Sequence, residues 1–498
     1  MATRAAPWEP SEEESLRILG EQNPWHSTGR VPEGLAARTE RALARMLARR
    51  LSSDTPRRFQ LVLGPRRVGK TTAMYQTVRH LLDGGVPAAR LWWFRLDHPI
   101  LLQRPLEDLV RIAMKAAHAT ESAPVHLFLD ELTYARDWDL WLKTFYDERW
   151  PLRIAGTSSA TAALRERHLE SGVGRWEEQY LAPYLFDEFL GLVGRAPTLA
   201  VGGCLGETLA TATASAWWDP QLAPLRQRFS LIGGFPELLL LGDEGLDDET
   251  YLLRSQRVLR SDAVERAIYK DIPQAFGVGE PILLERLLYV LAGQMTGVLS
   301  PTAICKNLGL SQPTFDRYLS FLERAFIVFT LPNFSGNETK VQRRGRKLYF
   351  VDGAVRNAAL QRGTAPLVDP QEMGLLNENL AASHLYALAR QSQVRLFHWK
   401  DGKDEVDLIY DDPARPLAFE IGSSPSHHRR GLAALVARFP RFDGGAWYVA
   451  PGLPARAPGA GGDPIGTLPL ELLLLAAGRQ AAEELTRRLA PNRSIVGG

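Results

Sequence analysis

The chain has 498 residues, 45% of them apolar and 23% charged, which is enough to bury several cores in two to four domains. Its two cysteines, Cys204 and Cys305, are too few for a disulfide framework and lack metal-type spacing, so we expect reduced core residues. The 59 basic and 57 acidic residues leave a net charge of +2, which neither demands nor excludes nucleic acid and confines any DNA site to a local patch.

Residues 1–55 predict a polar arm and then a basic amphipathic helix, from about residue 35 to residue 50, that covers a sheet or bridges protomers. The N-terminus is acidic and lacks the apolar segment of a secretion signal. No uninterrupted apolar run in the sequence reaches the roughly 18 residues that span a bilayer. We therefore expect a cytoplasmic protein without a membrane partner.

Residues 64–71 fit the phosphate-loop pattern G-x-x-x-x-G-K-[ST] at every fixed position. A buried strand is predicted before the loop at residues 59–63, and an amphipathic helix after it. Backbone N–H groups and the helix dipole then meet the phosphates of ATP or GTP, Lys70 places its charge on the β and γ oxygens, and Thr71 ligates Mg²⁺. An ordinary glycine turn is the alternative. The predicted nucleotide-binding residues are Gly64, Pro65, Arg66, Arg67, Val68, Gly69, Lys70, Thr71 and Thr72.

A hydrophobic strand at residues 125–129 ends in two carboxylates, Asp130 and Glu131. In a parallel sheet this places both beside the phosphate loop. We expect Asp130 to hold Mg²⁺ through water and Glu131 to orient and deprotonate the attacking water; a solvated acidic pair is the alternative. The next apolar segment, residues 152–156, leads to Thr157 and Ser158, whose hydroxyls are candidates for sensing the γ-phosphate unless they form a plain turn.

Strand and helix patterns alternate through residue 190, which predicts an α/β doubly wound P-loop ATPase domain over residues 56–190. Residues 191–298 are mainly helical in pattern, with a sharp break at residues 233–237. We interpret this region as a helical lid or linker.

Residues 299–352 change character and predict a winged helix-turn-helix. Ser300 and Pro301 begin a short helix, residues 307–310 make the turn, and Ser311 caps a longer helix. A short strand and a basic segment, residues 340–347, follow as the wing, with a charge density that suits phosphate contacts. Use of this domain for packing, with a merely solvated hairpin, stays open. The predicted DNA-binding residues are Gln312, Arg317, Lys340, Arg343, Arg344, Arg346 and Lys347.

Residues 353–450 predict a restriction-nuclease-like α/β domain of the PD-(D/E)xK type. Its acidic residues follow in the order typical of such nucleases: Glu378 on a helix, Asp407 on a strand and Glu420 on the next strand. Together these three carboxylates suit one divalent cation. The lysine two residues later is replaced by Gly422, so we expect a degenerate site that does not cut DNA. Lys400 or Lys403 is the alternative source of that lysine. Residues 451–498 predict a Gly/Ala/Pro linker and a terminal helix.

The succession of these motifs resembles the prokaryotic AAA-type ATPases that carry a winged-helix and nuclease-like C-terminal domain. The similarity spans about residues 55 to 450. It implies an AAA-type fold, ATP rather than GTP, and work as a homo-oligomer, for which a hexamer is one candidate. Such oligomers place an arginine against a neighbour's γ-phosphate. Arg175 is the candidate for that arginine or for a sensor, and a helix-surface arginine is the alternative. The resembling segments are residues 64–72, 129–131, 156–159, 174–175, 181–189, 233–237 and 347–352.

Two function classes stay open. The first is an oligomeric motor that uses ATP and Mg²⁺ to translocate on, or remodel, duplex or branched DNA without cutting it. The second is a nucleotide-controlled regulatory or defence switch that acts through protein partners. The basic segment beside the predicted helix-turn-helix favours the motor.

Overall fold

The computed structural model describes residues 10–36, 39–53, 57–158, 174–215, 217, 219–240, 248–337, 341, 345–423 and 429–487. The chain divides into two compact units. The first comprises the described residues of the ranges 1–64, 69–181 and 485–498, and the second those of 65–68 and 182–484.

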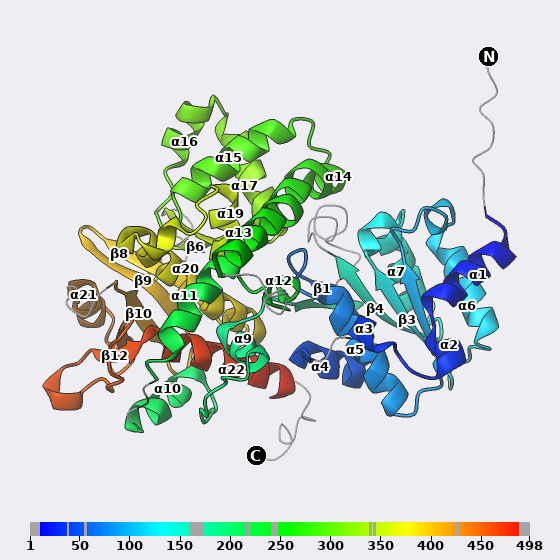
Figure 1. Ribbon diagram of the computed structural model, residues 1–498, viewed down its shortest axis with the longest axis horizontal. Coiled ribbons are helices and arrows are strands. Elements are labelled where there is room, and N and C mark those ends of the chain that lie inside the picture. Colours follow the sequence, from blue (N-terminus) through cyan, green and yellow to red (C-terminus); the bar gives the residue numbers. More distant parts are fainter. Residues whose placement is uncertain are drawn as a thin grey trace. The chain divides into compact units, whose positions relative to one another are not determined.

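The first unit is built on a five-stranded parallel sheet with the strand order β2-β3-β4-β1-β5 (Figure 1). Strands β1 and β3 are buried along their whole length, as expected for a parallel sheet covered on both faces. The α-helices and strands of this unit are α1 (Glu12–Gln22), α2 (Trp25–Thr28), α3 (Glu33–Ala36), α4 (Ala42–Ser52), β1 (Phe59–Leu63), α5 (Lys70–Asp83), β2 (Leu91–Arg95), α6 (Leu106–Ala116), β3 (Val125–Asp130), α7 (Trp138–Asp147), β4 (Leu152–Ser158) and β5 (Trp176–Tyr180).

The N-terminal segment covers this sheet. The Asn23 side chain accepts a hydrogen bond from the backbone of Trp93 and donates one to its carbonyl at 3.0 Å, so it satisfies the edge of β2. Trp25 is fully buried and donates its indole N–H to the Leu91 carbonyl at 2.8 Å. The basic helix expected at about residues 35 to 50 is two pieces, α3 and α4, and α4 packs on the sheet with α5.

The second unit begins with a helical region. Helix α11 stops at Ile232, where Gly233 takes a positive φ of 78°, and α12 starts at Pro236, so the predicted break is present. The α-helices before the helix-turn-helix layout are α9 (Phe186–Leu192), α10 (Leu205–Ala214), α11 (Leu222–Ile232), α12 (Pro236–Leu240), α13 (Asp248–Leu259), α14 (Ile272–Phe276) and α15 (Pro281–Gly293). A π-helical stretch, residues 260–271, joins α13 to α14.

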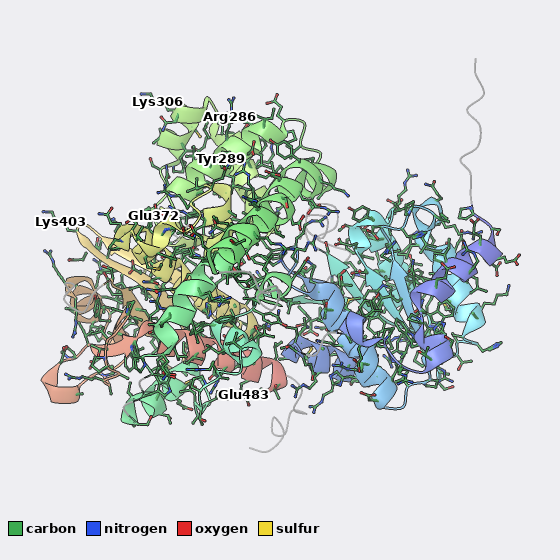
Figure 2. The ribbon with its side chains drawn as sticks, viewed as in Figure 1. Arg286, Tyr289, Lys306, Glu372, Lys403 and Glu483 are labelled. Carbon is green, nitrogen blue, oxygen red and sulfur yellow. The ribbon has the colours of Figure 1, made fainter. Side chains whose placement is uncertain are left out.

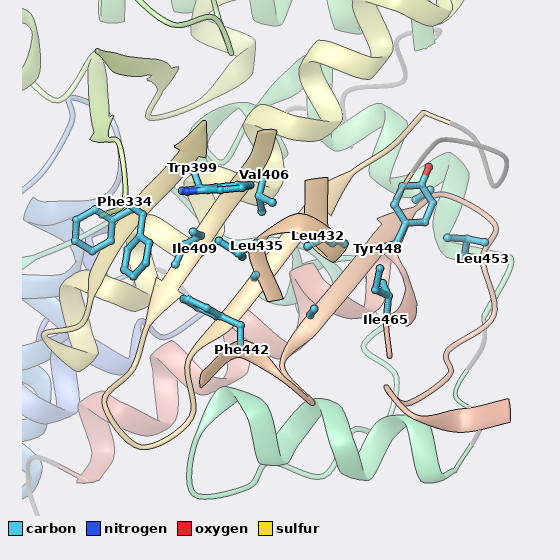
Figure 3. Close-up of a cluster of buried hydrophobic side chains, with 14 of the residues drawn as sticks. Phe334, Trp399, Val406, Ile409, Leu432, Leu435, Phe442, Tyr448, Leu453 and Ile465 are labelled. Carbon is cyan, nitrogen blue, oxygen red and sulfur yellow. The ribbon is translucent and has the colours of Figure 1, made fainter. Parts of the chain in front are cut away.

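A helix-turn-helix layout follows, with α16 (Pro301–Leu308), a turn at Gly309 with φ of 66°, and α17 (Gln312–Arg324). Ser311 caps α17 by accepting a hydrogen bond from the Thr314 amide. The antiparallel hairpin of β6 (Val328–Pro332) and β7 (Arg346–Phe350) comes next. The start of its connection is packed: Phe334 donates its amide to the His398 carbonyl and lies in the core of the C-terminal sheet (Figure 3).

The C-terminal sheet has five strands in the order β12-β11-β10-β9-β8. Strands β8, β9 and β10 are antiparallel neighbours, and β10, β11 and β12 run parallel. Gly466–Pro469 forms β12, so the predicted domain end at residue 450 is wrong: the sheet reaches beyond it, and part of the expected linker is a strand. The remaining elements are α19 (Gly353–Ala359), α20 (Pro370–Ser392), β8 (Arg395–Asp401), β9 (Asp404–Asp411), β10 (Leu417–Ile421), α21 (Arg430–Arg438), β11 (Ala446–Ala450), β12 (Gly466–Pro469) and α22 (Leu470–Arg487).

Among the described residues, no helix combines the length and the apolar character needed to cross a membrane.

Candidate functional site

The phosphate loop leaves the end of β1 and opens α5. Gly69 is the N-cap of α5 with φ of 87°, a left-handed conformation that glycine adopts without steric cost. Lys70 begins the helix and donates its ammonium to the Gly64 carbonyl at 2.9 Å, so its charge lies over the loop. Thr71 and Thr72 follow on the first turn of α5. Strand, loop and helix are therefore arranged as anion binding at a helix N-terminus requires.

Asp130, at the end of β3, lies beside this helix start. Its carboxylate accepts hydrogen bonds from the Thr71 hydroxyl at 3.1 and 3.2 Å and from the Thr157 hydroxyl at 2.7 Å. Burial raises the pKa of Asp130 to about 6, and the hydrogen bonds from the two threonines pull it the other way. The predicted grouping of Asp130 with Thr71 is thus present in the geometry.

Glu131 has an uncommon backbone conformation for a residue other than glycine. Its φ and ψ are 56° and 50°, which is left-handed backbone in a residue other than glycine. Its amide donates to the Thr157 hydroxyl at 3.0 Å. Its Oε2 atom is buried and has no hydrogen-bond partner among the residues that the structure describes. A buried carboxylate oxygen without a partner is costly, and at a catalytic site it is placed to receive a proton from a ligand or water.

Strand β4 lies between β1 and β3 and contributes Thr157 to the site. The Thr157 hydroxyl touches both Asp130 and the Glu131 backbone, which suits the predicted sensor position. Ser158 is the next residue and is buried, and because successive side chains of a strand point to opposite faces it does not share the position of Thr157. Ser159 lies outside the described residues.

The tip of the phosphate loop, Pro65–Val68, belongs to the second unit. Arg66 pairs with Asp271 in the π-helical stretch, with Nη2 2.5 Å from Oδ1. Arg67 has φ of 65° and pairs with Glu237 at 2.6 Å and Asp262 at 2.7 Å. The two arginines thus form ion pairs within the second unit.

Arg175 lies where the parallel strands begin, whereas the phosphate loop lies where they end. Its carbonyl accepts from the Phe59 amide at the start of β1, whereas the loop follows the end of that strand, roughly 16 Å away for five residues. Its guanidinium makes a two-point ion pair with Asp147 at 2.8 and 2.9 Å. The prediction that Arg175 acts as a sensor in the nucleotide site of its own chain is therefore wrong, because the length of a strand separates Arg175 from the phosphate loop. The role against a neighbouring protomer stays a prediction.

The predicted carboxylates of the C-terminal domain do come together. Glu378 lies on α20, Asp407 on β9 and Glu420 on β10. Burial and the charge of Asp407 raise the pKa of Glu378 to about 7 and that of Glu420 to about 9. Within the described part of the chain, the Oε2 atom of Glu420 is buried without a hydrogen-bond partner.

The lysine of this cluster comes from a place that sequence reasoning missed. Lys347 of β7 lies among the carboxylates, and Glu405 of β9 joins them. Lys400 pairs with Glu405 at 2.8 Å at the rim of the cluster and is 46% exposed. Lys403 is labelled in Figure 2 and lies in the turn between β8 and β9, at the outer end of the sheet. A sequence pattern could have pointed to Lys347: Lys347 and Tyr349 alternate with apolar residues, which puts both side chains on one face of a buried strand.

Two corrections concern the predicted DNA contacts. Lys347 cannot meet DNA, because it is buried and ion-paired. The second is that the described start of the β6–β7 connection does not stand free, because Asn333 and Phe334 bond to β8. Gln312, Arg317 and Arg346 are exposed, and Gln312 donates to Asp316 within α17. Lys340, Arg343 and Arg344 lie outside the described residues.

Two segments of the chain match known family models. Residues 56–190 match the AAA domain, and residues 225–365 match a domain of unknown function, DUF8612. The first match coincides with the sheet that carries the phosphate loop and Asp130. This part of the chain is similar to AAA-type ATPases. The match supports a nucleotide-binding AAA-type ATPase, which confirms that part of the predicted resemblance.

Two uncharacterised proteins of Methanocaldococcus jannaschii are relatives. MJ1544 is 24% identical over 362 residues, covering 71% of this chain and 72% of that protein. MJ1637 is 23% identical over 386 residues, covering 75% and 77%.

Two solved structures are also similar. A Walker-type ATPase of Pyrococcus abyssi has 14% identity and a TM-score of 0.41, covering 65% of this chain and 97% of that one. The ORC1 protein of Aeropyrum pernix in complex with DNA has 14% identity and a TM-score of 0.29, covering 65% and 92%. These scores carry no functional inference.

Proposed function

We propose that the chain hydrolyses ATP with Mg²⁺ at the end of β3, and that turnover drives remodelling of DNA without cutting it. The observation that carries the hydrolysis is Glu131, whose strained backbone and partnerless buried oxygen lie next to Asp130. The donor set of Thr71 hydroxyl and Asp130 carboxylate fits Mg²⁺, which prefers oxygen ligands. When bound, the ion neutralises charge on the phosphates.

The chain's own residues supply the other parts of the reaction. The loop amides and Lys70 hold the phosphates. Glu131 accepts the proton of the water whose oxygen forms the new bond to the γ-phosphorus. The bond from that phosphorus to the bridging oxygen breaks, and ADP and phosphate leave. Thr157 orients the Asp130 carboxylate and the Glu131 backbone through its hydroxyl.

The first prediction separates binding from turnover. Lys70→Ala removes the charge on the phosphates and should abolish tight ATP binding, whereas Glu131→Gln should bind ATP and lose about 10²-fold or more in hydrolysis rate. Binding is measured by fluorescent-nucleotide titration and turnover by phosphate release. Glu148→Gln is the matched control, because Glu148 follows the C-terminal end of α7, shortly before β4 begins, and so lies at the end of the strands opposite the phosphate loop. Near-normal hydrolysis by Glu131→Gln contradicts the assignment of the base.

Contact with DNA is proposed for the exposed face of the helix-turn-helix layout. Arg317 lies near the start of α17, and Arg346 begins β7; both are exposed. Lys306 on α16 and Arg286 on α15 are also exposed and are labelled at the outer end of this group of helices in Figure 2. Their charges suit phosphates, which carry most nonspecific affinity.

The second prediction tests this surface. Arg317→Ala and the triple variant Arg343→Ala/Arg344→Ala/Arg346→Ala should weaken binding to all DNA, and the salt slope should fall by about 0.9 for each phosphate whose cationic partner is removed. Lys347 is left unchanged, because its substitution would disturb the buried cluster. Arg136→Ala is the control, since Arg136 is 95% exposed in the other unit. Binding and ATPase rates are measured with single-stranded, duplex and junction DNA at several salt concentrations.

The docked hairpin favours a second candidate, a nucleotide-controlled switch that acts through protein partners. Asn333 and Phe334, at the start of the β6–β7 connection, contact β8 and the core of the C-terminal sheet, so this part of the hairpin serves packing within the second unit. DNA binding and ATPase stimulation that both fail to appear would support the switch and leave the hydrolysis proposal standing.

A further inference from the structure

Lys347 lies at the centre of the C-terminal carboxylate cluster. Its ammonium is 2.6 Å from Asp407, 2.9 Å from Glu378 and 3.1 Å from Glu405. These carboxylates come from β9 and α20, whereas Lys347 comes from β7 of the hairpin. A lysine ammonium has three N–H donors, so the three contacts use its whole capacity.

The lysine side chain is buried, with 3% of its surface exposed. Burial by itself lowers the pKa of Lys347, but Asp407 and the other acidic neighbours raise it by more, so the net pKa lies well above its usual value. Tyr349, two residues along the same face of β7, donates to Glu378 at 2.9 Å. The β7 face therefore carries both a fixed positive charge and a donor into the cluster.

The position where a nuclease of this type would carry its own lysine is filled. A Cβ atom at Gly422 would lie 1.8 Å from the Tyr448 hydroxyl oxygen and 2.5 Å from the ring carbon that bears it. Tyr448 is fully buried on β11, beside Glu420 in the parallel register (Figure 3). The space that a side chain at residue 422 would need is therefore taken by this tyrosine.

We propose that the Lys347 ammonium takes the place of a divalent cation among Glu378, Glu405 and Asp407, making this a metal-free ionic lock between the hairpin and the C-terminal sheet. This goes beyond the proposed ATPase and does not depend on it. Among the described residues, no three His, Cys, Asp or Glu side chains are arranged to hold a metal ion.

The physical reason is competition for the same oxygen atoms. A divalent cation binds carboxylate oxygens at about 2.0–2.6 Å, and those oxygens already contact the ammonium at 2.6 to 3.1 Å. An ion placed there would face the lysine charge at close range in a poorly solvated site, where repulsion is strong. Cutting chemistry through a metal at this place is therefore not expected.

The third prediction is tested on the full chain carrying Asp130→Asn, which removes the nucleotide-site carboxylate that also binds metal. Without nucleotide, Mn²⁺ binding is measured by the electron paramagnetic resonance of free Mn²⁺ up to about 1 mM, and Tm is compared in Mn²⁺ and in chelator. This parent should bind no Mn²⁺ in the cluster, and its Tm should be the same in both. Adding Lys347→Met should create one site, and Mn²⁺ should raise the Tm by about 2 °C or more.

Lys400→Met is the matched control, because Lys400 pairs with the same Glu405 at the exposed rim. It should gain no site, and adding Asp407→Asn to Lys347→Met should remove the gained one. If the Asp130→Asn parent binds one equivalent of Mn²⁺, and the added substitution Asp407→Asn abolishes that binding, the proposal is overturned. A folded Lys347→Met variant that gains no site overturns it too. If that variant does not fold, the parent measurement decides, and Lys347→Met/Glu378→Gln, which restores the charge balance, should fold without metal.

Discussion

The Thr157 hydroxyl links the Asp130 carboxylate to the Glu131 backbone at the end of β3. This single hydroxyl donates to Asp130 and accepts from the Glu131 amide. Strand β4 supplies both hydrogen bonds because it lies between the loop strand and β3. The left-handed backbone of Glu131 then holds its Oε2 atom in a buried position, where it has no partner among the described residues. Residues in such strained conformations persist where the surrounding structure fixes them, and they cluster at active sites.

The fourth prediction follows from the burial of Asp130. Its folded pKa of about 6 lies above the usual value of 3.8, so its contribution to stability is complete below the unfolded pKa and is lost as pH rises through about 6. Asp130→Asn should therefore stabilise the nucleotide-free protein by about 1–3 kcal/mol at pH 7.5 and abolish hydrolysis.

The difference in stability between Asp130→Asn and the wild type should shrink as the pH falls and vanish below the unfolded pKa of 3.8, where the wild-type carboxyl is protonated in both states. Calorimetry without Mg²⁺ across this range measures it. Asp97→Asn serves as control, because Asp97 follows β2 and is 46% exposed. A gap that stays constant with pH would refute this effect of burial.

The hairpin of β6 and β7 connects two parts of the second unit. One face of β7 carries Lys347 and Tyr349 into the carboxylate cluster. Its connection inserts Phe334 among Phe397, Phe439 and Phe442, with edge-on ring contacts at centroid distances of 5.2 to 5.5 Å (Figure 3). Edge-on aromatic pairs add to the burial of the ring. The described start of the predicted wing is therefore packed on the C-terminal sheet, which differs from the alternative of a merely solvated hairpin.

The fifth prediction concerns this docking. Phe334→Ala should destabilise the second unit by about 3–5 kcal/mol, because it leaves a cavity among aromatic rings. Ile282→Ala is the control: Ile282 is 60% exposed on α15, and its truncation should change stability by no more than about 0.5 kcal/mol. Denaturant unfolding followed by tryptophan fluorescence measures both, and nucleotide binding should be unaffected. Equal stability of the two variants would mean that the hairpin is not docked in solution.

At the scale of the whole molecule, the AAA-type unit is supported by its fold and by the AAA domain match. The motor and the switch differ in what the second unit contacts, which is why DNA-stimulated hydrolysis and its salt dependence separate them. Oligomer formation and the trans role of Arg175 stay predictions.

The sequence by itself determined the nucleotide site. Strand, glycine loop and helix are consecutive, so Gly69, Lys70 and Thr71 are positioned by local backbone geometry that a motif records. Asp130 and Glu131 were predictable because the ends of parallel strands meet at one edge of a sheet. The grouping of Glu378, Asp407 and Glu420 also followed from the order of helix and strands.

Only the tertiary structure decided which lysine joins those carboxylates and where Arg175 lies. Lys347 is 60 residues before Asp407 in the chain, and it reaches the cluster because the hairpin docks on β8. That docking depends on long-range packing of Phe334 and on side chains such as Tyr448, which no local spacing encodes. Arg175 was misplaced as a sensor because a Gly-Arg pair does not tell which end of a strand it occupies; the pairing of Phe59 with Trp176 does.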